Sequence, residues 1–194
     1  VAPNSTNNIS NITIGTNYYK YSDVLFIGDS ISAGATGGSN TATFAELYKT
    51  TTNKKIAVWA GTGDLTTITI NATNLALIQA MKPKKVHILL GTNDIGQGIA
   101  TSTINANLNT IITACITAGA KVYIGTIMPV NGRDNSGVNN YILGLTNSVI
   151  IPYHTIMDDP LSAGYMNPAW CDDLIHPNTA GHVVVKNTLL SYGV

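Results

Sequence analysis

The chain has 194 residues, of which 44% are hydrophobic and only 10% are charged. This length suits one domain with a sizeable core, and the hydrophobic content excludes a disordered chain. Ten basic residues balance ten acidic ones, and no basic run is longer than a pair of lysines. We therefore expect neither nucleic-acid binding nor binding to an anionic membrane. No stretch is long and apolar enough to cross a bilayer, and no signal peptide is visible.

The sequence predicts how the chain is divided into domains, and it bears on the state of the two cysteines. Residues 1–20 are rich in Asn and are interpreted as a linker or edge segment, and residues 21–194 as one folded domain. Two cysteines, Cys115 and Cys171, are too few for a disulfide framework. A bridge between them and two free thiols both stay open. Neither cysteine lies in a nucleophile motif, which argues against thiol catalysis.

The apolar runs predict a parallel sheet. Short runs rich in Val and Ile, typical of strands buried on both faces, lie at residues 23–28, 55–60, 85–90, 121–127 and 148–153. Helical patterns alternate with them, at residues 41–51, 66–81, 101–118, 137–147 and 178–191. This alternation implies right-handed βαβ crossovers and a three-layer α/β/α sandwich with a five-stranded parallel sheet.

Small polar residues follow three of the predicted strands. The first strand ends in Gly28-Asp29-Ser30, the second in Ala60-Gly61-Thr62-Gly63-Asp64, and the third in Gly91-Thr92-Asn93-Asp94. In open parallel sheets, ligands bind outside the carboxyl ends of the strands. A further polar segment, Asp173-Leu174-Ile175-His176-Pro177-Asn178, precedes the last helix. These segments are the candidate site.

The residue types in these segments fit nucleophilic catalysis by serine. Ser30, expected as an exposed hydroxyl at a strand end, would attack a carbonyl carbon, and His176 would take its proton. Asp173, three residues before the histidine, would orient the imidazole. The backbone N–H groups of Ser30 and Gly63 and the side-chain amide of Asn93 would stabilise the developing oxyanion.

These motifs together resemble the SGNH (GDSL) hydrolase family, which has a flavodoxin-like fold. The resemblance rests on four blocks in order, at Gly28–Ser32, Thr62–Asp64, Gly91–Asp94 and Asp173–Pro177. It implies Ser30 as nucleophile, Asn93 as oxyanion donor, and Gly63 as second-block glycine, with Gly61 as the alternative. The G-x-S-x-G elbow of the α/β-hydrolases does not surround Ser30.

The other carboxylates near the motifs are assigned structural roles. Asp29 and Asp94 are expected to bond loop amides, and the same role is favoured for Asp64. The family spacing selects Asp173 rather than the adjacent Asp172 as the partner of the histidine.

The remaining histidines are not assigned to the catalytic set. His87 is expected in the core, and His182 to be solvent-facing or capping. His154 follows a strand and could line the site. No His/Asp cluster has the spacing of metal ligands, so neither a metal nor a cofactor is expected.

Two further residues are candidates for substrate binding. Trp170 precedes the Asp173 loop and is either a platform for a sugar ring or acyl chain, or a residue that pins the loop to the core. Arg133, the only arginine, lies in a polar loop after the fourth strand. It could bind a substrate carboxylate, pair with Asp134, or be solvated.

The composition around the serine bears on the substrate. The family covers lipases, thioesterases, lysophospholipases and carbohydrate O-acetyl esterases. The stretch from Ala33 to Thr43 is small and polar, which favours acetyl esters of a polysaccharide or small molecule. A broad short-chain esterase, thioesterase or lysophospholipase is the alternative. A non-catalytic carbohydrate- or receptor-binding module is the alternative from another class. An extracellular or virion-associated protein is expected, and the oligomeric state stays open.

Overall fold

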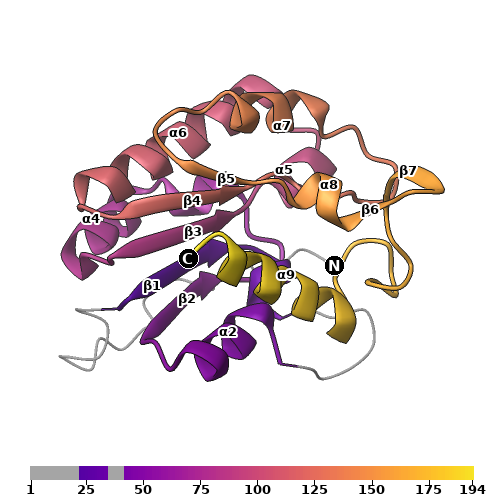
Figure 1. Ribbon diagram of the computed structural model, residues 1–194. Coiled ribbons are helices and arrows are strands. Elements are labelled where there is room, and N and C mark those ends of the chain that lie inside the picture. Colours follow the sequence, from indigo (N-terminus) through magenta and orange to yellow (C-terminus); the bar gives the residue numbers. More distant parts are fainter. Residues whose placement is uncertain (1–21, 35–41) are drawn as a thin grey trace.

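A five-stranded parallel sheet forms the centre of the fold (Figure 1). The structure is a computed structural model that describes residues 22–34 and 42–194. The strand order is β2-β1-β3-β4-β5, with β1 at Val24–Gly28, β2 at Ile56–Ala60, β3 at Lys85–Leu89, β4 at Lys121–Gly125 and β5 at Val149–Ile151. All five strands overlap the predicted apolar runs. The proposed linker at residues 1–20 and most of the polar stretch 33–43 lie outside the described residues.

Helices cover both faces of the sheet, as a three-layer sandwich requires (Figure 1). One face carries α3 (Thr66–Thr69), α4 (Ala72–Met81), α6 (Thr101–Thr117) and α7 (Ser136–Leu143), and the opposite face carries α2 (Phe44–Thr52) and α9 (Thr179–Ser191). The predicted architecture is therefore confirmed. Of the described helices, none is long and apolar enough to cross a membrane.

The two hydrophobic cores follow the period of two along the strands. In β1, Leu25 and Ile27 pack into the core under α4 and α6, whereas Val24 and Phe26 pack into the core under α2 and α9. The same alternation runs through β3 and β4. Burial on both faces explains why the strands are continuous apolar runs in the sequence.

Several short elements were not predicted. They are α1 (Ser30–Ala33), α5 (Thr92–Gly96), α8 (Tyr153–Met157) and an antiparallel hairpin of β6 (Asp158–Asp159) and β7 (Ser162–Met166). Each is too short to show a hydrophobic period. They lie in the connections that follow the carboxyl ends of β1, β3 and β5, and α5, α8, β6 and β7 are labelled in the right-hand half of Figure 1.

The predicted helix over 66–81 is broken in two. Asn71 is extended and its side chain accepts a hydrogen bond from the Asn74 N–H at 3.0 Å, which makes it the N-cap of α4. An Asn side chain can replace a helical backbone bond in this way, so a continuous apolar pattern did not give a continuous helix.

The two cysteines are free thiols on opposite sides of the sheet. Cys115 lies in the core under α4 and α6, and Cys171 in the core under α2 and α9. The sheet therefore separates them, and the possibility of a bridge is excluded. Burial raises the pKa of Cys115 to about 12, so its thiol is unreactive.

Two histidines are buried in the core under α2 and α9. His87 is packed among aromatic rings, as expected, and its Nε2 lies 3.2 Å from the Tyr153 hydroxyl. The expectation that His182 is solvent-facing was wrong, because its side chain is fully buried. Its Nδ1 accepts the Phe44 N–H at 3.3 Å, so it caps α2 rather than its own helix. Burial lowers the pKa of His87 to about 3, and burial and His176 lower that of His182 to about 4.

The segment that leads into α9 is held against that helix by a close backbone approach. The Asn178 N–H donates to the Trp170 carbonyl at 2.8 Å, and the Asn178 side chain caps the helix by accepting the Gly181 N–H at 3.1 Å. A Cβ at Gly181 would overlap the Trp170 carbonyl oxygen and lie 2.8 Å from Pro177 Cβ. Only glycine fits this contact, because any side chain would push the segment 167–178 off the helix.

The first prediction concerns this contact. We expect Gly181→Ala to destabilise the protein by about 1–3 kcal/mol through overpacking, and to increase hydrogen exchange of the amides in 170–178 more than elsewhere. Thermal unfolding and hydrogen exchange measured by mass spectrometry check this. Val183→Ala, on the exposed side of the same helix, is the matched control and should change neither result. Unchanged exchange in Gly181→Ala would contradict the close approach.

The second prediction concerns acid stability. The native His87 pKa, about 3, lies below that of the unfolded chain, so its contribution to stability is present near pH 7 and is lost as the pH falls from about 6.5 towards 3. In His87→Phe, the free energy of unfolding should decline less steeply between pH 4 and 6, by about 1.4 kcal/mol per pH unit. Urea titrations across this pH range measure how the free energy of unfolding changes with pH. The same slope in wild type and His87→Phe would refute the low native pKa of His87.

Candidate active site

Ser30 lies directly after the carboxyl end of β1, as the first residue of α1. Asp29 is the N-cap of this short helix, and its Oδ1 accepts the Ile31 N–H at 3.0 Å. Ser30 Oγ lies 2.9 Å from His176 Nε2, although 146 positions separate the two residues. The sequence led us to expect an exposed serine, but the residue as a whole is buried, with 6% of its surface exposed.

The loop before α9 holds Asp173 and His176 together. His176 Nδ1 lies 2.7 Å from Asp173 Oδ2, and Asp173 Oδ1 accepts the N–H groups of Ile175 at 2.9 Å and His176 at 2.7 Å. Partial burial raises the pKa of Asp173, but these hydrogen bonds outweigh it and hold the pKa below its usual value. Its neighbour Asp172 turns away and accepts from the Asn178 side chain at 3.2 Å.

The turn between these two residues is strained. Leu174 has a φ of +65°, in a left-handed conformation that non-glycine residues adopt at a cost of about 1–2 kcal/mol. This conformation lets one carboxylate bond both the imidazole and the backbone of the turn. Leucine does not favour it, so the sequence carried no signal for this feature, and it is at functional sites that such strain is concentrated.

Asn93 connects the turns after β2 and β3. It lies in the first turn of α5, and its Nδ2 donates to the Asp64 carbonyl at 3.0 Å. A primary amide has two N–H donors, so one donor beyond this bond is available to a ligand. Sequence reasoning found the residue but not this bond, which fixes the position of the amide.

The two candidate glycines after β2 have different surroundings. Gly63 has a φ of +80°, and no atom lies within 4 Å of where its Cβ would be. A Cβ at Gly61 would lie 2.7 Å from the Asp64 carboxylate, which covers it. The open backbone at Gly63 is the one that a substrate can approach.

Buried carboxylates brace the turns behind the site. Asp94 is fully buried and accepts hydrogen bonds from the backbone N–H and the hydroxyl of Thr66, while Asn107 donates to the same hydroxyl at 2.8 Å. This network ties α5 to α3 and α6, in the loop-organising role expected for Asp94.

Burial raises the pKa of Asp29 to about 7, against the opposing effects of the Ile31 N–H and of His176. Partial burial also raises the pKa of Asp64.

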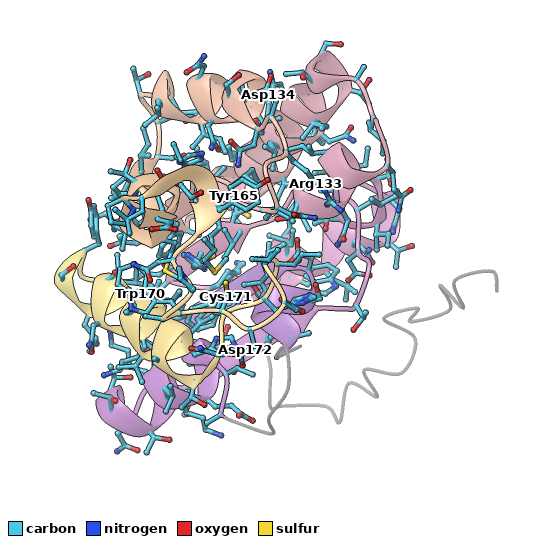
Figure 2. All side chains as sticks on the ribbon, turned by 90° about the vertical axis from the view of Figure 1, so that its right-hand side faces the viewer. Arg133, Asp134, Tyr165, Trp170, Cys171 and Asp172 are labelled. Atoms are coloured by element: carbon cyan, nitrogen blue, oxygen red, sulfur yellow. The ribbon has the colours of Figure 1, made fainter. Side chains whose placement is uncertain are left out.

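The two candidate substrate-binding residues lie on the face shown in Figure 2. Trp170 is half-buried against the core under α2 and α9 and so pins its loop, while part of the ring stays exposed. Arg133 is also half-buried, and its guanidinium packs on Gly96. Asp134 does not pair with it but accepts the Ser136 N–H at 2.9 Å. His154 is bonded through its backbone N–H to Thr126 Oγ1 at 2.8 Å.

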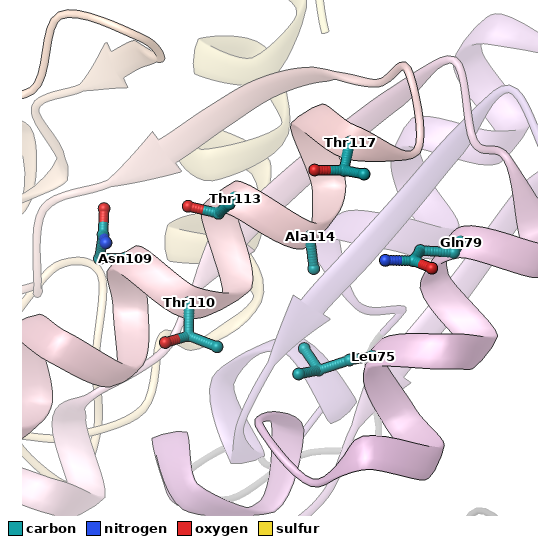
Figure 3. A pocket seen from close by; sticks show the side chains of 7 residues that line it. All are labelled: Leu75, Gln79, Asn109, Thr110, Thr113, Ala114 and Thr117. Atoms are coloured by element: carbon teal, nitrogen blue, oxygen red, sulfur yellow. The ribbon is translucent and has the colours of Figure 1, made fainter.

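A hollow of about 370 Å³ lies between α4 and α6, away from the candidate site (Figure 3). Its polar lining comes from Gln79 of α4 and from Asn109, Thr110, Thr113 and Thr117 of α6. The lining of this hollow contains no carboxylate, histidine, lysine or cysteine that could act as an acid, base or nucleophile. The two helices lead into the amino ends of β3 and β4, the edge of the sheet opposite the candidate site. Throughout the described part of the chain, no three His, Cys, Asp or Glu side chains gather as metal ligands do.

Comparison with solved structures shows the same fold in several ester hydrolases. A protein of the lipolytic G-D-S-L family from Desulfitobacterium hafniense has a TM-score of 0.74 at 13% identity, covering 89% of this chain and 99% of its own. A mutant of an acetyl-xylooligosaccharide esterase from Geobacillus Stearmophilus has 0.66 at 17% identity, covering 89% and 94%. An esterase from Pseudoalteromonas sp., inhibited by monoethylphosphonate, has 0.65 at 17% identity, covering 89% and 96%.

The sequence itself matches a family model. No curated protein matches the chain, but the model of the GDSL-like lipase/acylhydrolase family matches residues 26–184. That range spans β1 to α9 and contains Ser30, Asn93, Asp173 and His176. The chain thus belongs to the GDSL-like lipase/acylhydrolase family, and it is a serine ester hydrolase.

Proposed function

We propose that this enzyme hydrolyses short-chain esters, foremost acetyl esters on a carbohydrate. The observation that carries the proposal is the continuous chain from Ser30 Oγ to His176 Nε2, at 2.9 Å, and from His176 Nδ1 to Asp173 Oδ2, at 2.7 Å. This is the arrangement by which a carboxylate orients a histidine and the histidine activates a serine.

The chemistry follows from this chain. Ser30 Oγ attacks the ester carbonyl carbon as its proton passes to His176 Nε2, while Asp173 stabilises the imidazolium. The oxyanion is bound by the backbone N–H groups of Ser30 and Gly63 and by Asn93 Nδ2. Collapse expels the sugar alkoxide, which takes the proton from His176. Water then attacks the acyl-serine, again through His176, and releases acetate and the free serine.

Small polar groups around the serine support a short acyl chain. The turns that carry the proposed oxyanion donors present the open backbone of Gly63 and the Asn93 amide, which is bonded to the Asp64 carbonyl, and these polar groups favour a short acyl chain. The fold is also that of an acetyl-xylooligosaccharide esterase. A neutral, Asn- and Thr-rich chain suits a hydrophilic leaving group such as a sugar.

A broader short-chain esterase or thioesterase is the second candidate. Leu174, beside the proposed catalytic pair, is 41% exposed, and Leu161 at the tip of the β6–β7 hairpin is 93% exposed. These side chains would favour a more apolar substrate. A purely binding module is disfavoured, because a binder has no need for the aligned serine, histidine and aspartate.

The third prediction tests the proposed function. Wild-type enzyme should hydrolyse p-nitrophenyl acetate faster than butyrate and much faster than laurate, and Ser30→Ala should abolish the activity while leaving the melting temperature close to that of the wild type. The control is Ser191→Ala, at the far end of α9, which should keep full activity. Activity that peaks at longer chains would replace the acetyl esterase with the second candidate, and activity that survives Ser30→Ala would overturn the mechanism.

The fourth prediction concerns the proposed oxyanion donor. Asn93→Ala should lower kcat by about 10²–10³-fold with a small effect on KM, because the amide acts mainly on the transition state. Steady-state kinetics measure this, with circular dichroism to verify folding, since the substitution also removes the bond to the Asp64 carbonyl. A kcat equal to that of the wild type would exclude Asn93 from the oxyanion site.

A further inference from the structure

Charged residues are distributed unevenly between the two edges of the sheet. Lys55, Lys85 and Lys121 stand at the amino ends of β2, β3 and β4. Aspartates follow the carboxyl ends, at positions 29, 64, 94, 134, 158, 159, 172 and 173. Of the described loops that follow the carboxyl ends of strands, only 126–135 contains a lysine or arginine, which is Arg133. Among the described residues, this guanidinium is therefore the permanent cation of the catalytic edge.

The packing of Arg133 places it near the proposed oxyanion donor. A Cβ at Gly96 would lie 2.5 Å from its Nη1 and 3.1 Å from its Cζ, so the guanidinium rests on the backbone of Gly96. Gly96 is the last residue of α5, the helix that holds Asn93 in its first turn. Gly96 comes three residues after Asn93, about one helical turn along α5, so the guanidinium packs against the same short helix that carries the proposed oxyanion donor.

The loop that carries Arg133 is well anchored. The Arg133 N–H donates to the Val130 carbonyl at 2.8 Å, and the buried Asn135 side chain donates to the Met128 carbonyl at 3.0 Å. The Gly132 N–H donates across to the Gly164 carbonyl of β7 at 3.2 Å. Figure 2 shows Arg133 on the same face as Tyr165 of that strand. The arginine thus starts from a fixed backbone, which lowers the entropy lost on binding.

Among the described residues, the guanidinium has no acidic partner. Arginine presents five N–H donors, yet within the described residues it makes neither an ion pair nor a side-chain hydrogen bond. The adjacent Asp134 is committed to the Ser136 N–H. A half-buried guanidinium that no described side chain pairs with, packed on the helix that carries Asn93, fits a bidentate carboxylate.

We propose that Arg133 binds a carboxylate carried by the leaving group, so that the substrate is an ester of an acidic sugar or another carboxylate-bearing alcohol. This inference rests on the proposed esterase function. An acetyl group has no charged group of its own. In an acetyl ester, the carboxylate that Arg133 binds must therefore belong to the alcohol part of the substrate. The aspartates at the same edge of the sheet repel anions in general. The expected selectivity is therefore for a single carboxylate placed at Arg133, and not for polyanions.

The fifth prediction uses two acetyl esters that differ in one charge. 4-Acetoxybenzoate releases a carboxylate-bearing phenol, and methyl 4-acetoxybenzoate releases its neutral counterpart. The measured quantity is the ratio of kcat/KM for the anionic ester to kcat/KM for the neutral ester. Arg133→Gln should lower this ratio by roughly 10- to 100-fold from its wild-type value. Arg133→Lys should fall between the two, because a lysine keeps the charge and loses the bidentate geometry.

Two further variants separate position from charge. Gly96→Ala keeps the arginine, but its methyl group would lie 2.5 Å from the present position of Nη1. The guanidinium must therefore shift, and the ratio should fall below the wild-type value although the charge is kept. Lys55→Gln removes an exposed cation from the opposite edge and should leave the ratio at its wild-type value.

The outcomes separate this inference from the function on which it rests. Hydrolysis of both esters, with the same ratio in wild type and Arg133→Gln, would overturn the role of Arg133 and leave the esterase intact. No Ser30-dependent hydrolysis of either ester would overturn both. A lowered ratio in Lys55→Gln would overturn the local contact in favour of overall charge. A higher kcat/KM for an acetylated methyl galacturonoside, which carries one carboxylate, than for the neutral acetylated methyl galactoside, with the preference lost in Arg133→Gln, would extend the result to sugars.

Discussion

The parallel register of β1 with its two neighbours decides where chemistry can occur in this protein. Gly28 lies opposite Ala60 of β2 and Leu89 of β3, so the turns that follow these three strands begin at one level. Ser30, Gly63 and Asn93 come from those turns. A slip of one residue would exchange the side chains of the two cores. The packing that fixes the register therefore also fixes the distance between the proposed nucleophile and its proposed oxyanion donors.

The histidine and its carboxylate reach this edge by a different device. They lie in a loop near the C-terminal end of the chain, and α9 holds that loop through the contact of Gly181 with the Trp170 carbonyl. The left-handed Leu174 folds Asp173 back onto His176. Two local features with no side-chain chemistry of their own thus align the proposed catalytic residues.

Asp29, a buried carboxyl group beside Ser30, makes the fold less stable at neutral pH than at low pH. Asp29 keeps its proton more tightly in the native state, with a pKa of about 7, than in the unfolded chain. Its contribution to stability is therefore present below about pH 4 and is lost as the pH rises to about 7. The carboxylate nevertheless caps the helix that begins with Ser30. This agrees with a general pattern in which active sites retain groups that a purely structural core would replace.

The sequence by itself determined the five strands, the layers and the motif residues, because burial on both faces imposes continuous apolar runs and turns favour Gly, Asp and Asn. It also predicted Asp173 rather than Asp172, although only through the spacing known in the family. Tertiary structure alone decided that Ser30 is buried, that His182 caps α2, that Leu174 is left-handed and that Arg133 rests on Gly96. The positions of Ser30, His182 and Arg133 depend on contacts between segments distant in the chain, and such contacts leave no periodic pattern in the residues that make them. The Leu174 conformation is local, but leucine gives no sign of it because leucine does not favour a positive φ.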